Sequence, residues 1–203
     1  MKHIITLLLA LQIVGSANGQ IRIVEDFEDS TSLDWTEYAD KQVRAVVQMG
    51  ALELEAMDSE FAVNCTTELP IVPEYDFKVI AKLTIPKVDG KNLFGILVDM
   101  DEDFNKLAFL FMEDLFMVRH YNNGVIDRSK GEIRPIKLKG GNNCTMELVL
   151  TRKGGSYIIE YDNIEVFRWK RVLHSPHFGF YTTGKIRVEE MILEQEYTGQ
   201  QEY

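Results

Sequence analysis

The sequence lacks a basic excess, a second long apolar run, and any long stretch with the apolar period of a helix. Its 22 basic and 32 acidic residues give a net charge of −10. Nucleic acids and anionic membranes attract basic surfaces, so this balance argues against both as main partners and fits neutral or cationic ligands. Beyond the N-terminus no apolar run approaches the roughly 20 residues that cross a bilayer. We therefore expect a soluble mature chain without membrane insertion.

Catalytic and cofactor motifs are also missing. The sequence contains no Gly-x-Ser-x-Gly nucleophile elbow and no phosphate-binding loop. Apart from His3, the histidines are His120, His174 and His177, and their spacing is not that of a metal site. No motif therefore favours nucleophilic catalysis or a histidine-bound metal.

Residues 1–19 predict a cleavable signal peptide. A basic start precedes an apolar segment, and small residues, among them Ala17 and Gly19, precede the expected cut before Gln20. The apolar segment has about 11 residues, which is too few to span a bilayer. We therefore expect an exported protein, secreted or periplasmic. A membrane anchor or a buried strand is the alternative for this segment.

The rest of the chain has the period of two residues that is typical of β-strands. Every second residue is apolar in 77–85, whereas 94–98 and 107–112 are apolar throughout, as expected for central strands of a sandwich. Residues 42–57 predict one hairpin, and Asn122-Asn123-Gly124 is typical of another.

The same pattern predicts the organisation of the domain. No linker or internal repeat interrupts the chain, so we predict one all-β domain over residues 20–203, a two-sheet antiparallel β-sandwich. A short helix over residues 189–197 is an alternative to a last strand there.

Two cysteines, Cys65 and Cys144, lie in alternating strands and are expected to face the core. Export permits a disulfide between them, which would close a loop of about 80 residues and contribute roughly 4 kcal/mol. Two buried free thiols are the alternative. Each cysteine follows an asparagine and precedes a threonine, so Asn64 and Asn143 match the N-glycosylation pattern, which matters in a eukaryotic host.

Strand and turn motifs follow one another in a characteristic order from about residue 70 to 195. They are Pro73-Glu74-Tyr75-Asp76-Phe77, Phe94 to Asp99 with an acidic turn ending at Asn105, Val118 to Tyr121 before Asn122-Asn123-Gly124, Asn143 before Cys144 to Leu150, Tyr157 to Tyr161 before Asp162-Asn163, and Gly179-Phe180-Tyr181 before Thr183-Gly184. This order resembles the concanavalin A-like lectin and glucanase superfamily, including its laminin-G-like members. The resemblance implies a jelly roll of two curved sheets, with a concave face that holds a saccharide in many relatives. It implies no single activity, because enzymes, lectins and adhesion modules share the fold.

Retaining glycosidases of this fold carry alternating acids on one strand, as Glu-x-Asp-x-Glu or Glu-x-Asp-x-x-Glu. Glu74-Tyr75-Asp76 has no third acid. Glu53 and Glu55 alternate with leucines, as an ordinary solvated strand face would. Catalysis is therefore the less favoured prediction.

A run of alternating oxygen ligands is the one candidate metal site. It consists of Asp99, Asp101, Asp103 and Asn105. Calcium favours several hard oxygens from one loop, but the run lacks the glycine and the bidentate glutamate of a helix-loop-helix site. The pattern is typical of an acidic hairpin turn, with a calcium site as the alternative.

A saccharide site needs an exposed aromatic ring with hydrogen-bonding side chains around it. The candidates are Trp35, Tyr38, Arg119, Tyr121 and Trp169. Arg119 and Tyr121 share one face of a strand, with His120 on the other. Ordinary packing of arginine on an aromatic ring, and core-edge positions for the two tryptophans, are the alternatives.

Together these features predict a secreted, non-catalytic binding module with a carbohydrate ligand on the concave sheet. A glycoside hydrolase with atypical acidic residues is one alternative. The other is a structural or interaction domain of an envelope assembly, with an extracellular protein as its partner. Calcium is the only cofactor that the sequence suggests.

Overall fold

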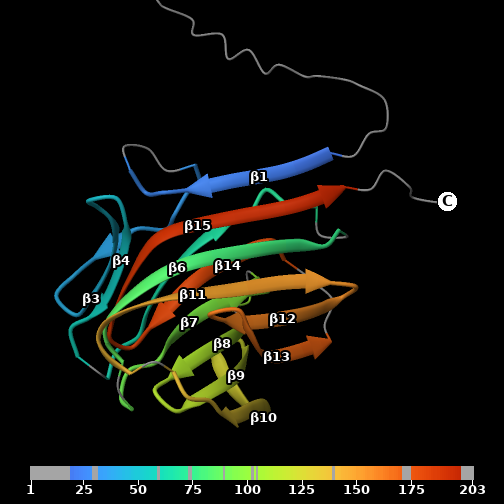
Figure 1. Ribbon diagram of the computed structural model, residues 1–203. Helices are drawn as coiled ribbons and strands as arrows, with labels where there is room; N and C mark the ends of the chain where they lie inside the picture. The colour runs from blue at the N-terminus through green and yellow to red at the C-terminus, as the bar shows by residue number, and fades with distance from the viewer. Residues whose placement is uncertain are drawn as a thin grey trace, which may run out of the picture.

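The structure is a two-sheet antiparallel β-sandwich (Figure 1). The computed structural model describes residues 19–28, 32–58, 60–72, 75–88, 90–101, 103, 105–138, 140–170 and 175–197, which form strands and no helix. The strands are β1 (Gly19–Glu25), β2 (Tyr38–Ala39), β3 (Val43–Val47), β4 (Leu52–Ala56), β5 (Val63–Glu68), β6 (Phe77–Val88), β7 (Phe94–Val98), β8 (Lys106–Met112), β9 (Leu115–Asn122), β10 (Val125–Pro135), β11 (Gly141–Lys153), β12 (Ser156–Tyr161), β13 (Ile164–Lys170), β14 (His177–Thr182) and β15 (Lys185–Tyr197). The predicted all-β sandwich is therefore confirmed. No helix in this part of the chain is long and apolar enough to cross a membrane.

The larger sheet has nine strands in the order β13-β12-β11-β6-β15-β4-β3-β2, with β1 also paired to β15. In Figure 1 its long strands descend from β1 to β13. β15 pairs with β6 along one side and with β4 and then β1 along the other. This sheet therefore joins the first and the last described strands of the chain.

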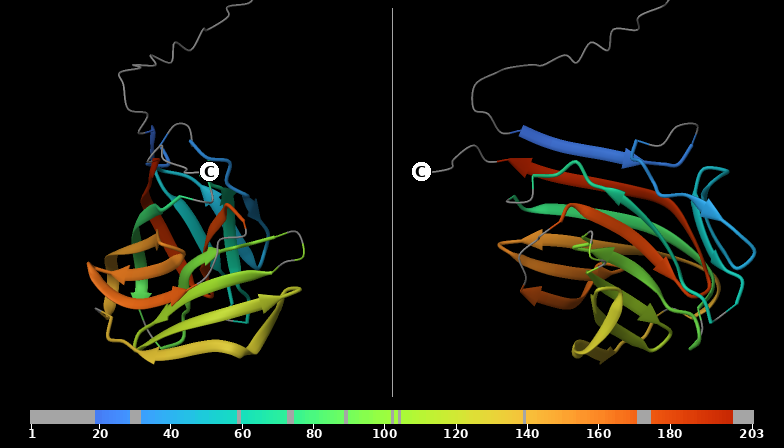
Figure 2. Two further views of the ribbon diagram at one scale, coloured as in Figure 1. Left: turned by 90° about the vertical axis from the view of Figure 1, so that its right-hand side faces the viewer. Right: turned by 180° about the vertical axis from the view of Figure 1, so that it is seen from behind.

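The smaller sheet has six strands in the order β10-β9-β8-β7-β14-β5. Figure 2 shows it from behind as the second layer of the sandwich. All of the residues of β7 and nearly all of those of β8 are buried. The continuous apolar runs in the sequence thus correspond to central strands that are covered on both faces, as predicted.

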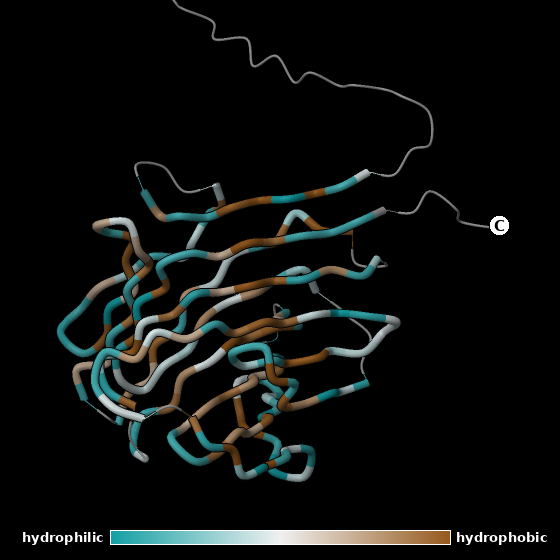
Figure 3. Tube along the Cα trace, viewed as in Figure 1, coloured by the Kyte–Doolittle hydropathy of each residue, from teal (hydrophilic) through white to brown (hydrophobic). Residues whose placement is uncertain are grey.

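The main core lies between the two sheets. Inward-facing residues of β6 alternate with outward-facing ones, and the same alternation is visible along the long strands in Figure 3. Phe111 and Phe116 of the smaller sheet pack with ring centroids 5.1 Å apart in this core. Burial of such large apolar side chains supplies most of the driving force for the sandwich.

Two predicted hairpin turns are confirmed. Asn123 and Gly124 have φ angles of 49° and 76° between β9 and β10, and Met49 and Gly50 have φ angles of 50° and 65° between β3 and β4. Two successive positive φ angles characterise the tight turn whose twist matches that of the flanking strands. Asparagine and glycine tolerate this left-handed region better than other residues do.

The alternative of a short helix over residues 189–197 is wrong, because these residues belong to β15. They hydrogen-bond to β6 on one side and to β1 on the other. Met191, Leu193 and Gln195 face inward and are buried. Pairing with two neighbouring strands outweighs the local preference of this polar segment.

The chain after β1 is organised by the side chain of Glu25, which is fully buried. Its carboxylate accepts hydrogen bonds from the backbone N–H groups of Phe27, Ser32 and Leu33 at 3.3, 2.8 and 3.0 Å. These N–H groups have no strand partner, so the carboxylate satisfies donors that would otherwise be buried without a hydrogen bond.

Residues 1–18 lie outside the described residues, so the signal peptide stays a prediction.

Candidate functional site

Two of the five candidate saccharide contacts serve the fold instead. Trp35 is 8% exposed and stacks on Phe180 with ring centroids 5.7 Å apart, so it offers no open face to a ligand. The hydroxyl of Tyr38, on β2 of the larger sheet, accepts a hydrogen bond from the backbone N–H of Asn64 at 3.1 Å and donates one to its carbonyl oxygen at 2.8 Å. Since Asn64 belongs to β5, Tyr38 ties the two sheets together.

Trp169 is half-buried on β13 and faces the interior of the sandwich. Its ring lies 5.8 Å from that of Phe167 and 5.2 Å from that of His120, which reaches across from β9. The core-edge alternative for Trp169 therefore fits its position. Its neighbour His120 is the link between this edge of the core and the surface pocket described below.

Arg119 and Tyr121 do share one face of β9, as predicted, and this face points away from the core. Both side chains are half-buried. Lys106 on β8 lies beside these two residues. It is paired with Tyr121 in the sheet, and its ammonium group lies 5.0 Å from the centre of the Tyr121 ring. Burial lowers the pKa of Lys106.

Tyr181 lies on β14, and its side chain reaches across the sheet toward the same group. Burial raises its pKa to about 12, and nearby Tyr121 adds to the rise whereas Arg119 opposes it. Tyr181 is paired with Gly95, and Ala108 lies opposite Arg119. These small residues leave room for the long side chains to meet above the intervening strands.

The centre of this outer face is closed by its own side chains. Leu97, Ala108 and Leu110 are fully buried although they point away from the main core, and they form a second apolar cluster with Met117 and Tyr181. A ligand therefore finds no deep groove over the middle of the smaller sheet. Access is better at the ends of the strands.

The acidic run after β7 forms a turn that is held by its own hydrogen bonds. Asp101 accepts from the backbone N–H groups of Asp103 and Asn105 at 3.1 and 2.9 Å and from the amide of Asn105 at 2.9 Å. The side-chain bond from Asn105 is the largest of the effects that lower the pKa of Asp101. In turn, the Asn105 oxygen accepts from the backbone N–H of Asn123 at 3.1 Å.

These bonds engage oxygens that a calcium ion would need. Within the described part of the chain no three His, Cys, Asp or Glu side chains lie close enough together to hold a metal ion. The geometry fits the hairpin-turn interpretation of this run, and calcium binding stays a prediction.

Asp99, the first acid of the run, is 2% exposed. It accepts a hydrogen bond at 2.9 Å from the hydroxyl of Tyr157, which lies on β12 in the opposite sheet. The first carboxylate of the run therefore bridges the sandwich rather than facing solvent.

One pocket of about 300 Å³ brings several predicted residues together at this end of the smaller sheet. It lies where β7 ends, β8 begins, and β9 turns into β10. Its lining consists of Asp99, Asp101, Asn105, His120, Tyr121, Asn122, Asp127 and Lys130. We call it the Tyr121 pocket, since Tyr121 supplies its only half-exposed tyrosine or tryptophan ring.

Three larger hollows are less suited to a saccharide. Those of about 550 and 940 Å³ have no tryptophan, tyrosine or phenylalanine in their lining. The one of about 490 Å³ on the larger sheet offers the half-buried ring of Tyr75, but no asparagine or glutamine lines it. The Tyr121 pocket combines a half-buried tyrosine ring with the amide side chains of Asn105 and Asn122.

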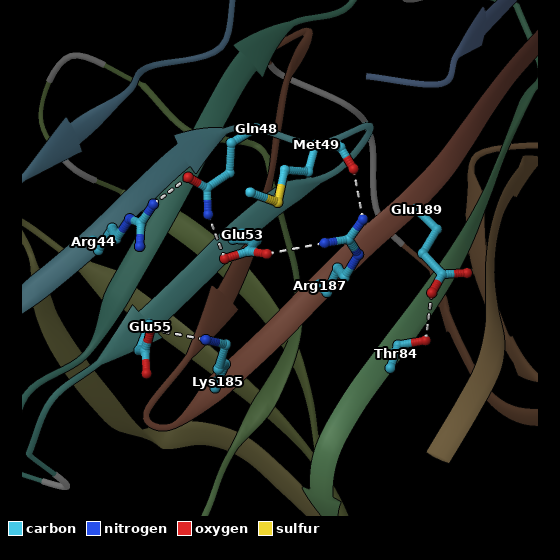
Figure 4. Close-up of polar contacts among 9 residues, drawn as sticks. All are labelled: Arg44, Gln48, Met49, Glu53, Glu55, Thr84, Lys185, Arg187 and Glu189. Carbon is cyan, nitrogen blue, oxygen red and sulfur yellow. Dashed lines mark hydrogen bonds and ion pairs between the residues drawn. The ribbon is translucent and has the colours of Figure 1, made fainter. Parts of the chain in front are cut away.

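The paired acids Glu53 and Glu55 lie on the outer face of the larger sheet, far from this pocket in the sheet order, and each has a cationic partner. Figure 4 shows Glu53 bonded to Arg187 at 3.0 Å and Glu55 bonded to Lys185 at 3.0 Å. Gln48 also donates to Glu53 at 2.8 Å. The Glu53 side chain is 13% exposed and that of Glu55 is 26% exposed, so this network is more enclosed than the ordinary solvated strand face that the sequence predicted.

Both cysteines are free. Cys65 is buried on β5 of the smaller sheet and its thiol contacts the carbonyl oxygen of Thr36 at 3.1 Å, whereas Cys144 is half-buried on β11 of the larger sheet. Alternation correctly predicted that both face inward. Of the two alternatives, a disulfide or two free thiols, the structure has the free thiols, on strands of opposite sheets. Asn143 is exposed at the start of β11, while Asn64 is half-buried.

Sequence reasoning missed Lys106, Tyr181, Asn122, Asp127 and Lys130. The first of these carries the only detectable signal, since it is the polar residue that precedes the apolar run 107–112. Tyr181 joins the site through the pairing of distant strands, whereas Asn122, Asp127 and Lys130 come from the same hairpin as Tyr121.

The comparisons with known proteins agree with this geometry. No family model and no curated protein matches the sequence. Among solved structures, the carbohydrate-binding module CBM66 from Bacillus subtilis aligns with a TM-score of 0.53 at 16% identity, covering 76% of this chain and 90% of that one. The β-glucanase of Bacillus licheniformis aligns with a TM-score of 0.56 at 10% identity, covering 88% and 98%. The CBM2 module of the evolved Dit protein of Lactobacillus casei BL23 phage J-1 aligns with a TM-score of 0.56 at 10% identity, covering 91% and 99%. At such identities the likeness shows the fold alone, which is the concanavalin A-like jelly roll.

Proposed function

We propose that this chain is a carbohydrate-binding domain without catalytic activity, and that its ligand binds at the Tyr121 pocket. The observation that carries the proposal is the half-buried ring of Tyr121 beside Asn122 and Asn105, at an open end of the smaller sheet. An aromatic ring next to polar side chains can contact the apolar face of a sugar while its hydroxyl groups are hydrogen-bonded. Structures that share the fold include two described as carbohydrate-binding modules.

The arrangement of acids supports a non-catalytic role. A glycosidase needs two carboxylates about 5–5.5 Å apart, or about 6.5–9.5 Å apart, facing one sugar. The central strands β7, β8, β9 and β14 carry no acid at all. In the Tyr121 pocket, Asp99 and Asp101 accept hydrogen bonds from the protein, and Asp127 accepts from Ser129 and pairs with Lys130.

We also propose that the domain acts outside the cytoplasm, on the basis of the signal peptide that residues 1–19 predict. Export suits a domain that meets glycans. Expression of the full chain with N-terminal sequencing of the product tests this part, and a mature chain beginning at Gln20 is the expected result.

The test of binding is a glycan array probed with residues 20–203. We expect binding to a limited set of glycans, and we expect Tyr121→Ala to weaken it by about tenfold or more. Tyr75→Ala is the matched control, because Tyr75 lines a hollow on the other sheet. Absence of binding across a broad array would exclude this function.

An interaction domain is the second candidate, and one observation favours it. Val125 and Ile133 are 70% and 68% exposed on β10, which is an edge strand of the smaller sheet. Exposed apolar residues on an unpaired edge can recruit another protein surface. Two results together would favour this candidate over carbohydrate binding. The protein would bind no glycan on the array, and it would self-associate in a way that Ile133→Lys abolishes.

A further inference from the structure

The cations on the two outer faces of the sandwich differ in the partners that they have. On the larger sheet four cations are paired with glutamates, namely Arg22–Glu194, Lys82–Glu189, Lys185–Glu55 and Arg187–Glu53. Figure 4 shows two of these pairs side by side on β4 and β15. This face has no spare positive charge at these positions.

On the described part of the smaller sheet, two cations beside Tyr121, Arg119 and Lys106, have no acidic partner. Among the described residues, neither Arg119 nor Lys106 forms an ion pair or a hydrogen bond, although both side chains are half-buried. Strand register places them on adjacent strands, with Lys106 opposite Tyr121 and Arg119 opposite Ala108. Partial burial without a counter-charge is unfavourable for a cation, as the lowered pKa of Lys106 indicates.

The nearest described acids form no ion pair with Arg119 or Lys106. Asp101 is held by three hydrogen bonds within its turn, Asp99 bonds Tyr157 across the sandwich, and Asp127 pairs with Lys130 at 3.4 Å. Strands β7 and β8 contain no acid, whereas β10, which pairs with β9, carries Asp127 and also Glu132, whose carboxylate bonds Arg134 at 2.6 Å. In a chain with a net charge of −10, Arg119 and Lys106 are thus two cations to which the described residues supply no ion pair.

On the basis of the proposed carbohydrate-binding function, we propose that the ligand is an acidic saccharide. Arg119 and Lys106, which lie beside the Tyr121 pocket rather than in its lining, bind its anionic group, and the ring of Tyr121 packs against the sugar. The guanidinium group of arginine offers two parallel N–H donors that match the two oxygens of a carboxylate or a sulfate. The net negative charge of the chain suggested neutral or cationic ligands. The two cations beside Tyr121 favour an anionic ligand at this site instead.

The experiment compares four groups of glycans on one array: neutral, uronic-acid-containing, sialylated and sulfated. The mature chain, Arg119→Gln, Lys106→Gln and the control Lys82→Gln are applied at low and at high salt. Lys82→Gln removes the same charge from the opposite face, where Lys82 pairs with Glu189. A circular dichroism melt of each variant shows that it is folded.

We expect the mature chain to bind acidic glycans, with weaker binding at high salt. Arg119→Gln is expected to lower the affinity by about tenfold or more, Lys106→Gln by less, and Lys82→Gln by no more than about twofold. The uronic-acid, sialylated and sulfated groups then show whether a carboxylate or a sulfate is recognised.

Binding of neutral glycans only would overturn the inference and leave the proposed function in place. The inference would also fail if Lys82→Gln weakened binding as much as Arg119→Gln, or if poly-L-glutamate competed as well as the bound glycan, because the site would then recognise charge alone. If the protein bound none of the four groups of glycans, the proposed function would be excluded, and the inference with it.

Discussion

The hydroxyl of Tyr157 donates a 2.9 Å hydrogen bond to Asp99 across the interior of the sandwich. Tyr157 is fully buried on β12 of the larger sheet, and Asp99 follows β7 of the smaller one with a φ angle of 55°. Aspartate is one of the few residues besides glycine that enter this left-handed region at low cost. The bond therefore fixes the start of the acidic turn that forms one wall of the Tyr121 pocket.

Loss of this bond should destabilise the domain measurably. Tyr157→Phe removes the donor and leaves a buried carboxylate with one hydrogen bond fewer, so we expect the free energy of unfolding to fall by about 1–3 kcal/mol. Urea denaturation followed by circular dichroism measures the change. Asp103→Asn, an exposed acid on the same turn, should change it by less than about 0.5 kcal/mol. Strictly additive effects of Tyr157→Phe and Asp99→Asn in a double-mutant cycle would argue against a direct bond.

Glu25 should be more sensitive than any exposed acid nearby. Glu25→Ala leaves three backbone N–H groups without their acceptor, and we expect a loss of about 3 kcal/mol, whereas Glu25→Gln retains one oxygen and loses about half as much. Thermal and urea unfolding give these values. Asp34→Asn removes the same charge from an exposed position in the same loop and serves as the control. Equal stability of Glu25→Ala and Asp34→Asn would show that the carboxylate does not organise this loop.

Gly95 should tolerate no side chain. A methyl group at this position would overlap the carbonyl oxygen of Phe109 and lie 3.0 Å from the Cα of Leu110 on the neighbouring strand. Because backbone atoms cannot move aside as a flexible side chain can, we expect Gly95→Ala to yield little folded protein. Gly90→Ala is the control, since its nearest neighbour is a glutamate oxygen 3.9 Å away. Yields of soluble protein and melting temperatures compare the two, and a fully stable Gly95→Ala would contradict this packing.

The thiol of Cys65 should be unreactive in the folded protein. The pKa of Cys65 is raised from an ordinary value of 9.0 to about 12, and burial of the thiol is the largest cause. A raised folded-state pKa means that the protonated thiol stabilises the fold below pH 9, and that this contribution is lost as the pH rises from 9 to about 12.

Alkylation by iodoacetamide at pH 8 tests the state of this thiol in a Cys144→Ala background. The native protein should react at least about a hundredfold more slowly than the same protein in urea, because only the exposed thiolate is nucleophilic. Similar rates in the two conditions would mean that Cys65 is accessible.

The sequence predicted the strands well, because each strand has a local pattern of apolar residues. Alternation in residues 77–85 and continuous apolarity in 94–98 follow from burial on one face or on both faces of a strand. The hairpin at Asn123 and Gly124 was equally predictable, because few residue pairs adopt two positive φ angles. Residues 189–197 were harder, as their polar composition does not reveal that two other strands hold them in β15.

The candidate site was only partly predictable. Arg119 and Tyr121 were placed on one strand face by their spacing alone, and this is confirmed. Whether Trp35 is a surface platform or a core residue depends on Phe180, which lies far along the chain, and spacing contains no information about that contact.

By itself, the sequence determined the all-β class, the order of strands and turns, and the inward direction of Cys65 and Cys144. These properties depend on neighbours within a few residues, which set backbone angles and the alternation of faces. Only the tertiary structure decided which strands pair, and with them the bond from Tyr157 to Asp99, the free state of the two thiols, and the position of Lys106 over the ring of Tyr121. Such contacts join segments that are distant in the chain, so they arise from the register and packing of the two sheets rather than from any local pattern.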